Sequence, residues 1–297
     1  MPEQQDQIYH QPVLLDEVIR YLDLKAGGTY LDCTVGGAGH LMAMLKRTQD
    51  TTFIGIDCDP DAVAYSRELT SAYSKRCYLI EDNFINLDLI LDKLNIGGVD
   101  GALFDLGVSY HQLATPSRGF SYEREGRLLM NMSPVTESLS DRLRRVRKNE
   151  IIKVLKEFGD VRNYRKLGQR IYDARRNLHS TLELRRLVED SVPRRFLKKN
   201  LQKVFQALRI WTNDELSNLS QALPTAFQRL GKEGRMVVIS YHSGEDRIVK
   251  RFFRQLKVSG KARLLSKKAM KPSDEEIREN PRARSARLRG AEKCASS

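Results

Sequence analysis

Residues 29–40 (Thr-Tyr-Leu-Asp-Cys-Thr-Val-Gly-Gly-Ala-Gly-His) combine an acid, three glycines and a histidine at the end of a short apolar run. Glycine adopts positive φ readily and lets a ligand approach the backbone closely. A strand that leads through a glycine turn into a helix N-terminus is the first half of a nucleotide-type binding site. The dinucleotide spacing Gly-x-Gly-x-x-Gly is absent, and the acid at the start of the turn, Asp32, favours a loop that binds S-adenosylmethionine (SAM). A tight turn without a ligand is the alternative.

Further acidic residues follow other apolar runs. Asp57 ends the run 52–57, about 20 residues after the glycine turn, where such folds bind ribose hydroxyls. Asp105 ends the run 99–104, and residues 82–84 follow a third run. In a parallel sheet, ligands bind at the carboxyl ends of the strands. We therefore expect Asp57, residues 82–84 and Asp105 to lie with the glycine turn in one crevice.

The elements that must position these side chains alternate between strand and helix. Strands are predicted over residues 29–33, 52–57, 77–80, 99–104 and 235–241, and helices over residues 10–24, 41–46, 60–72, 87–94, 205–230 and 245–256. Strand–helix repeats imply parallel β-α units. The sequence therefore predicts an α/β fold with a doubly wound, Rossmann-like sheet.

The alternation stops after Asp105. Residues 106–135 read as a long irregular stretch, which in a compact domain is usually functional or a lid. Residues 136–203 read as helices with apolar stripes, which predicts an all-helical subdomain inserted in the sheet domain. The tail beyond Ser259 is predicted to be partly extended and to end in disorder. The predicted domains are residues 1–110 and 206–260 for the two parts of the core, 111–205 for the insert and 261–297 for a basic tail.

The composition of the 297-residue chain suits a globular protein. No apolar run approaches the roughly 18 residues of a membrane span, and the first ten residues lack the apolar region of a signal peptide. The four cysteines show no C-x-x-C spacing, so small core residues in a reducing cytosol are favoured over disulfides or a metal site.

The net charge of +13 is unevenly distributed. Residues 1–140 carry 11 Lys and Arg against 20 Asp and Glu, a net charge of −9. Residues 141–205 carry 20 against 8, a net charge of +12, and residues 206–260 and 261–297 add +4 and +6. This asymmetry is expected of a nucleic-acid binder, and a solvated helical surface without a partner is the alternative.

The chain resembles the bacterial small-subunit ribosomal RNA cytosine-N4 methyltransferase (RsmH, or MraW) family from residue 10 to residue 289. The motifs are specific in combination, although each alone is weak. They are His10-Gln11-Pro12-Val13-Leu14-Leu15, residues 32–40, Asp105-Leu106-Gly107-Val108-Ser109, Gln112-Leu113, Arg118-Gly119-Phe120-Ser121, Phe205-Gln206-Ala207-Leu208-Arg209-Ile210, residues 240–247 and Asn280-Pro281-Arg282-Ala283-Arg284-Ser285.

The resemblance implies a SAM-dependent methyltransferase core of the seven-strand type with an inserted helical domain. It implies a cytoplasmic enzyme that methylates the N4 amine of a cytosine in the decoding region of 16S ribosomal RNA, in the small ribosomal subunit, without a metal or a membrane. It leaves a homodimer open. By position, the family's cofactor contacts fall on Ala38, Gly39, His40, Asp57, Phe84, Asp105 and Gln112.

The chain differs from the family's usual residues at four positions within the stretches that resemble it. The family usually has glycine at Ala38, an acid at Leu129, an arginine at Asn131 and leucine at Gly244. These differences bear on the RNA contacts more than on the cofactor site.

Methyl transfer from a sulfonium is an in-line displacement, in which holding the partners at near-attack distance contributes up to about 7–11 kcal/mol. Asp105 is the predicted catalytic residue. It is placed to accept the N4 hydrogens or to hold the methionine part of the cofactor, and a turn aspartate is the alternative. Asp57 should accept both ribose hydroxyls. Phe84 packs either on adenine or in the core, and His40 either donates to the cofactor carboxylate or caps a helix.

Hydrolase chemistry is not supported at His242, Ser243 and Glu245, because no Gly-x-Ser-x-Gly motif surrounds the serine. We expect residues 240–247 to close the target pocket instead. Tyr110, Phe120 and Tyr122 are candidates for base stacking, since a base must leave its stack to reach a methyl donor, or for loop packing. Methylation of another RNA or DNA, and a non-catalytic RNA-binding role in ribosome assembly, are the competing functions.

Overall fold

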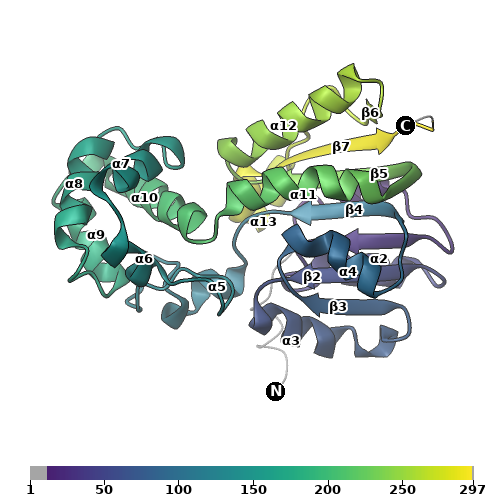
Figure 1. The fold of residues 1–297 in the computed structure, drawn as a ribbon, viewed down its shortest axis with the longest axis horizontal. Coiled ribbons are helices and arrows are strands. Elements are labelled where there is room, and N and C mark those ends of the chain that lie inside the picture. The colour runs from purple at the N-terminus through teal and green to yellow at the C-terminus, as the bar shows by residue number, and fades with distance from the viewer. Residues whose placement is uncertain (1–11, 296–297) are drawn as a thin grey trace. The chain divides into compact units, whose positions relative to one another are not determined.

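The computed structural model describes residues 12–295 (Figure 1). The chain forms two compact units. Met1–Ser109 and Leu216–Ser297 make up the first, which we call the sheet unit, and Tyr110–Glu215 make up the second, the helical unit. His10 and Gln11 of the first family motif lie outside the described residues. Within residues 12–295, no helix has the length and apolar character needed to cross a bilayer.

In the described residues, seven strands form one sheet in the order β3-β2-β1-β4-β5-β7-β6. Their bounds are β1 Thr29–Asp32, β2 Thr52–Asp57, β3 Cys77–Glu81, β4 Val99–Asp105, β5 Leu230–Ser240, β6 Ala262–Leu264 and β7 Arg287–Lys293. Strands β1 to β5 pair in parallel, whereas β7 is antiparallel to β5 and β6. The chain leaves β1 toward β3 and returns through β4 toward β5, so the strand order reverses between β1 and β4. Ligands bind at such a reversal, at the carboxyl ends of the strands.

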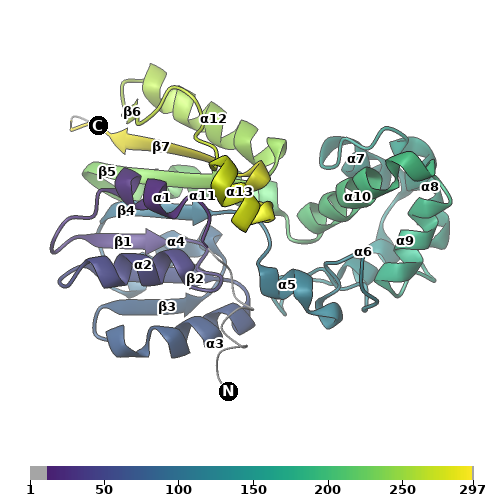
Figure 2. The ribbon, with the colours of Figure 1, turned by 180° about the vertical axis from the view of Figure 1, so that it is seen from behind.

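Helices cover both faces of this sheet, as the opposite views in Figures 1 and 2 show. One buried core contains side chains of α4, α11 and α12. The other contains side chains of α1, α2 and α3. The helix bounds are α1 Leu15–Leu22, α2 Gly39–Arg47, α3 Pro60–Leu69, α4 Leu87–Lys93, α11 Glu215–Arg229, α12 Ser243–Val258 and α13 Asp274–Glu279. Two helical layers around a mostly parallel sheet confirm the predicted doubly wound α/β class.

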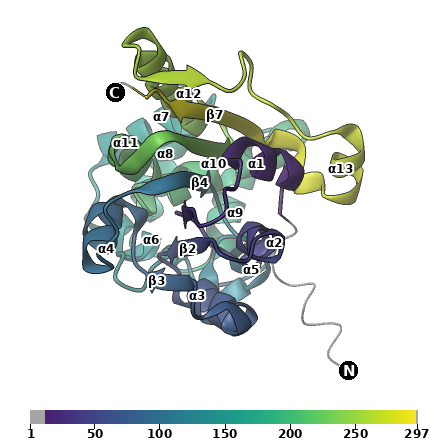
Figure 3. The same cartoon turned by 90° about the vertical axis from the view of Figure 1, so that its right-hand side faces the viewer.

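The C-terminal segment, predicted to be a basic and partly extended tail, contributes two strands to the sheet. Strand β7 lies between β5 and β6 in the sheet (Figure 3). Its Leu288 and Ala291 are fully buried. Arg287 and Arg289 donate hydrogen bonds to the carboxylate of Asp246 on α12. The basic composition was misleading because these arginines are matched by an acid from a distant part of the chain, which composition does not reveal.

The helical unit is built from short helices around α10, which contacts α6, α7 and α9. Aliphatic side chains on the inner faces are buried, among them Leu143, Ile151, Leu167, Leu184 and Leu208. The bounds are α5 Tyr110–Ala114, η4 Pro116–Arg118, α6 Leu139–Arg145, α7 Lys148–Glu157, α8 Tyr164–Ala174, α9 Thr181–Glu189, η5 Arg194–Phe196 and α10 Leu197–Thr212. The stretch predicted to be irregular therefore contains α5 and η4.

Two predicted boundaries differ from the structure. The division between residues 205 and 206 falls inside α10, and the compact helical unit ends at Glu215. The single helix predicted over residues 205–230 is two helices, α10 and α11, interrupted at Asn213 and Asp214. Asp214 has a φ of 49°, and Asn213 Nδ2 donates to the Arg209 carbonyl at 2.9 Å. The apolar period continues across this break, which is why the pattern hides it.

Candidate active site

The glycine turn joins β1 to α2 and is fixed by main-chain hydrogen bonds. Val35 N donates to the Ile56 carbonyl of β2 at 3.0 Å, and Ala38 N donates to the Val35 carbonyl at 2.8 Å. Gly36 and Ala38 have φ values of 51° and 57°. Only glycine adopts this left-handed region without a steric penalty. A glycine at position 38, which the resemblance leads one to expect, would relieve the strain that the alanine carries.

Asp57 at the end of β2 holds this turn with its carboxylate. Its Oδ2 accepts a hydrogen bond from Gly36 N at 2.8 Å, and its Oδ1 accepts one from Asp59 N at 2.9 Å. Burial raises the pKa of Asp57 to about 6, although these N–H donors oppose the shift. The N–H of Cys58 also stabilises the charged form of this carboxylate, which offers about four acceptor sites in all. Ribose hydroxyls would be further donors to this carboxylate, and the ribose contact stays a prediction.

Asp105 at the end of β4 lies in a polar network. Its Oδ1 accepts a 2.8 Å hydrogen bond from the Tyr241 hydroxyl, and its backbone N–H donates to Thr34 Oγ1 at 2.6 Å. Its Oδ2 lies 3.5 Å from Nδ1 of His40. Burial, together with the Asp105 charge, raises the pKa of Tyr241 well above its ordinary value. The phenol therefore stays protonated at neutral pH and continues to donate.

The sequence interpretation missed Tyr241. It follows directly after β5, the parallel neighbour of β4. The rule that singled out Asp57 and Asp105, a polar side chain at the carboxyl end of a parallel strand, would have found it too. Gly107, which follows β4 with a φ of +104°, has the Tyr241 ring 3.4 Å from the position of a Cβ. This glycine lets the tyrosine lie against the backbone beside Asp105.

His40 in the first turn of α2 is 5% exposed, and both of its ring nitrogens lie near oxygen atoms. Its Nε2 lies 3.0 Å from the Val13 carbonyl oxygen, which can only accept, so Nε2 carries the hydrogen. Its Nδ1 faces Asp105. The N-cap of α2 is Ala38, without a side-chain cap, so the helix-capping alternative does not describe His40. Because Nε2 carries the hydrogen, Nδ1 donates to Asp105 only when the ring carries both protons. Donation by His40 to the cofactor carboxylate stays a prediction.

Asp32 is a second residue that the predicted site did not include, although it begins the glycine turn. It is 2% exposed, and its Oδ1 accepts a hydrogen bond from Thr34 N at 3.1 Å. Burial raises the pKa of Asp32 to about 7. The hydrogen bond from Thr34 lowers this pKa, whereas the negative charges of Asp105 and Asp57 raise it further. Three acids at the ends of β1, β2 and β4 thus repel one another. The positive sulfonium and ammonium groups of SAM would relieve this repulsion, so the residues fit this cofactor.

Phe84 begins η3 (Phe84–Asn86), two residues beyond the end of β3, and is half-buried. Its ring packs edge-on against Phe104 with centroids 5.7 Å apart. Asn83 fixes the start of η3 because its side chain accepts a hydrogen bond from Ile85 N at 3.0 Å. One edge of the ring therefore belongs to the core. Because the ring keeps some exposure, packing against adenine stays a prediction.

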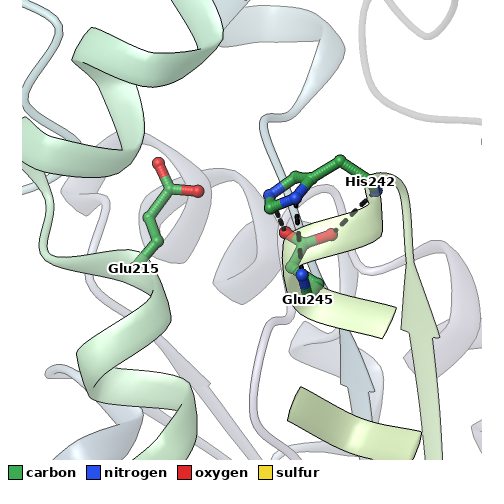
Figure 4. Close-up of side chains that lie close together, drawn as sticks. All are labelled: Glu215, His242 and Glu245. Atoms are coloured by element: carbon green, nitrogen blue, oxygen red, sulfur yellow. Dashed lines mark hydrogen bonds and ion pairs between the residues drawn. The ribbon is translucent and has the colours of Figure 1, made fainter. Parts of the chain in front are cut away.

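His242 and Glu245 cap α12, as the dashed lines in Figure 4 show. His242 Nδ1 accepts from Gly244 N at 3.1 Å, and Glu245 Oε2 accepts from Tyr241 N at 2.8 Å and from His242 N at 3.2 Å. Glu215, also labelled in Figure 4, accepts two hydrogen bonds from Arg209 of the helical unit. The capping bonds fix the main chain immediately after β5, which in turn fixes Tyr241. Closure of a target pocket by residues 240–247 stays a prediction.

The remaining predicted residues belong to the helical unit. Gln112 on α5 is 5% exposed. Phe120 is also buried, and Tyr122 packs edge-on against Phe205 with centroids 5.5 Å apart. For Phe120 and Tyr122 the packing alternative therefore describes the structure better than base stacking. Tyr110 begins α5 and is half-buried.

Comparison with known proteins assigns the chain. The model of a family described as "MraW methylase family" matches residues 7–294. This chain belongs to the MraW methylase family. The family expected from the motifs is confirmed, and with it a SAM-dependent methyltransferase.

Curated relatives match along nearly their whole lengths. A protein of Carboxydothermus hydrogenoformans is 39% identical over 96% of this chain and 97% of its own. One of Thermotoga neapolitana is 40% identical over 96% of each chain, and one of Coprothermobacter proteolyticus is 41% identical over 95% of each. All three are named ribosomal RNA small subunit methyltransferase H.

Proposed function

We propose that this protein transfers the methyl group of SAM to the N4 exocyclic amine of a cytosine in the decoding region of 16S ribosomal RNA. The observation that carries the proposal is Asp105, held by Tyr241 and His40 beside the glycine turn at the reversal of strand order. Membership of a methylase family, with relatives named for methylation of the small subunit RNA, selects the substrate.

Within this proposal, the cofactor supplies a methyl group on positive sulfur. Asp57 accepts the ribose hydroxyls, in addition to the main-chain donors that already fix its carboxylate. Ala38 and Gly39 bring the main chain of the turn close to the cofactor, and Phe84 packs against its adenine. Gln112 completes the proposed cofactor contacts.

Asp105 is the proposed catalytic residue. Cytosine N4 is a weak nucleophile because its lone pair is delocalised into the ring. A carboxylate that accepts its hydrogens favours the localised amine and the positive charge that develops on attack. Tyr241 holds one oxygen of the Asp105 carboxylate, and a protonated His40 would hold the other. This arrangement contributes positioning rather than strong general-base catalysis, since the methylated amine loses its proton readily.

The two compact units carry different charges. The helical unit has 24 Lys and Arg against 13 Asp and Glu, a net charge of +11. The sheet unit has 27 against 25, a net charge of +2, because the basic C-terminal segment belongs to it. We assign catalysis and most of the cofactor contacts to the sheet unit, and RNA binding mainly to the helical unit. With this function, the enzyme would act on ribosomal subunits in the cytoplasm. The proposed reaction requires neither a metal ion nor a second copy of the chain.

The deciding experiment is mass analysis of 16S ribosomal RNA nucleosides from cells with and without this protein. N4-methylated cytidine should disappear when the protein is absent, and purified protein with SAM should restore it. An Asp105→Asn variant, which changes only the charge and one acceptor, serves as the matched inactive control. Restoration by that variant, or an unchanged nucleoside profile, would contradict the proposal.

A non-catalytic assembly protein and a DNA methyltransferase are the competing functions. Titration of purified protein with SAM separates the first, since a protein without catalysis has no need of the cofactor. Methylation assays that compare 16S RNA with DNA of the same sequence separate the second. The absence of an Asp/Asn-Pro-Pro-Tyr-type sequence after Asp105 already disfavours DNA amino methylation.

A further inference from the structure

The structure divides the cations of the helical unit into paired and unpaired groups. Arg144 lies 3.3 Å from Asp141, and Arg145 pairs with Glu137. Further ion pairs within the unit join Arg142 to Asp214, Lys153 to Glu157, Arg170 to Asp190, Arg185 to Glu189, Lys203 to Asp160 and Arg209 to Glu215. These cations are already paired with acids and therefore offer less charge to a partner.

A different group of cations lies where η5 passes into α10. Arg194, Arg195, Lys198 and Lys199 are all exposed. In the described part of the chain, none of the four has a carboxylate within ion-pair distance. Residues 194–199 contain no acid. Four positive charges within six residues therefore face solvent together, which costs self-repulsion unless an anion binds there.

Phe196 stands in the middle of these cations. It is 41% exposed, the only phenylalanine among the large exposed hydrophobic side chains of residues 12–295. The guanidinium carbon of Arg195 lies 4.8 Å from the centre of its ring. Pro193, directly before η5, has its φ fixed by its own ring, which limits how far the short helix can move. The exposed ring and the cations thus form one surface, which we call the Arg194–Lys199 platform.

We propose that the Arg194–Lys199 platform binds a single-stranded segment of RNA, with one base stacked on Phe196 and neighbouring phosphates on the four cations. This inference rests on the proposed function for the identity of the nucleic acid. Proteins that hold single strands combine a positive surface with aromatic rings on which bases stack. An apolar protein partner would match Phe196 but would leave four charges to be desolvated without counter-charges. Charge complementarity therefore favours RNA.

The test measures binding of a fluorescent single-stranded RNA, with the decoding-region sequence, to the full-length protein over a range of salt concentrations. Phe196→Ala should weaken binding about 5- to 150-fold, the range found for loss of one stacked base, and should leave the salt dependence unchanged. Phe196→Tyr keeps a stacking ring and should bind nearly as the wild type does. Because Phe196 is exposed, circular dichroism should show both variants folded.

A second variant replaces Arg194, Arg195, Lys198 and Lys199 with glutamine. Each lost phosphate contact should reduce the slope of log K against log salt by about 0.7 for a single strand. The matched control is Arg144→Gln with Arg145→Gln, two exposed arginines of the same unit that pair with acids. The control should change the slope by less than one contact.

Several results would contradict the proposal that the Arg194–Lys199 platform binds RNA. They are wild-type affinity in Phe196→Ala, an equal slope change in the Arg144/Arg145 control, or Phe196-dependent binding of polyglutamate in place of RNA. A wild-type protein that methylates 16S RNA but does not bind the single strand would also overturn it, and would leave the proposed function standing. If the wild type neither binds nor methylates RNA, both proposals fail.

Discussion

The hydroxyl of Tyr241 donates a 2.8 Å hydrogen bond to Oδ1 of Asp105, across 136 residues of sequence. The bond joins the ends of two neighbouring parallel strands, β5 and β4. It therefore sets the direction of a carboxylate that the proposed reaction needs in one orientation. The other carboxylate oxygen faces His40.

Tyr241→Phe should lower the rate of methyl transfer while SAM affinity changes little. A hydrogen bond to a charged group contributes about 1.5–3 kcal/mol, which corresponds to a loss of about 10- to 150-fold if it acts in the transition state. Single-turnover rates with saturating SAM and RNA measure the effect, and calorimetric titration measures SAM binding. A wild-type rate in the folded variant would show that Asp105 needs no orientation by Tyr241.

Asp57→Ala should weaken SAM binding. Two hydrogen bonds to the ribose would be lost, at about 1.5–3 kcal/mol each, and Gly36 N would lose its acceptor. Asp59→Ala is the matched control, because Asp59 is also buried nearby but its side chain accepts from Asp61 N at the start of α3. Calorimetry should show a large loss of affinity for the first variant and a small one for the second. Equal affinities would contradict the ribose contact.

The sequence predicts the positions of Asp57 and Asp105 at the ends of β2 and β4, because parallel β-α topology alone brings the carboxyl ends of the strands together. Tyr241 follows the same rule, but its contact with Asp105 depends on which strand lies next to β4. The periodicity of apolar residues does not predict the order of strands in a sheet. Phe120 and Tyr122 show the opposite error. Aromatic side chains in a long irregular stretch suggest ligand contacts, whereas here they are packed.

Asp32 gives a prediction for pH dependence. Its pKa is raised by burial from an ordinary 3.8 to about 7, so the folded protein holds this proton more tightly than the unfolded chain. The stability that the proton contributes is complete below about pH 4 and is lost as the pH rises to about 7. That interval corresponds to about 4 kcal/mol as an upper bound.

Asp32→Asn removes this titration and keeps a side chain of nearly the same size. Without SAM, the wild type should therefore lose more stability than the variant between pH 5 and pH 8. Urea denaturation at several pH values measures the difference in free energy of unfolding. Parallel pH profiles for the two proteins would mean that the Asp32 pKa is not raised.

The last prediction concerns Asp246, whose carboxylate links α12 to β7 by hydrogen bonds. It is 6% exposed, and it accepts hydrogen bonds from Arg289 Nε at 2.8 Å and from Arg287 Nη1 at 3.0 Å. Burial raises the pKa of Asp246, but the two arginines outweigh burial and hold it below its ordinary value. Removing one member of a buried pair costs about 3–5 kcal/mol, mainly because the other charge stays buried.

Asp246→Ala should therefore lower the free energy of unfolding of the sheet unit by at most about 3–5 kcal/mol. The loss should be smaller than this limit because Arg287 is 45% exposed and can turn to water. Glu137→Ala breaks an exposed pair with Arg145 and should cost less than about 1 kcal/mol. Because the Asp246 pKa is lowered, its contribution is present above about pH 4 and is lost as the pH falls through the folded value, so the two variants should converge in acid. Denaturant unfolding at pH 7 and at a pH below the lowered pKa of Asp246 measures this. A cost for Asp246→Ala no greater than that for Glu137→Ala at pH 7 would mean that β7 is held by its main-chain pairing and its buried Leu288 and Ala291 alone.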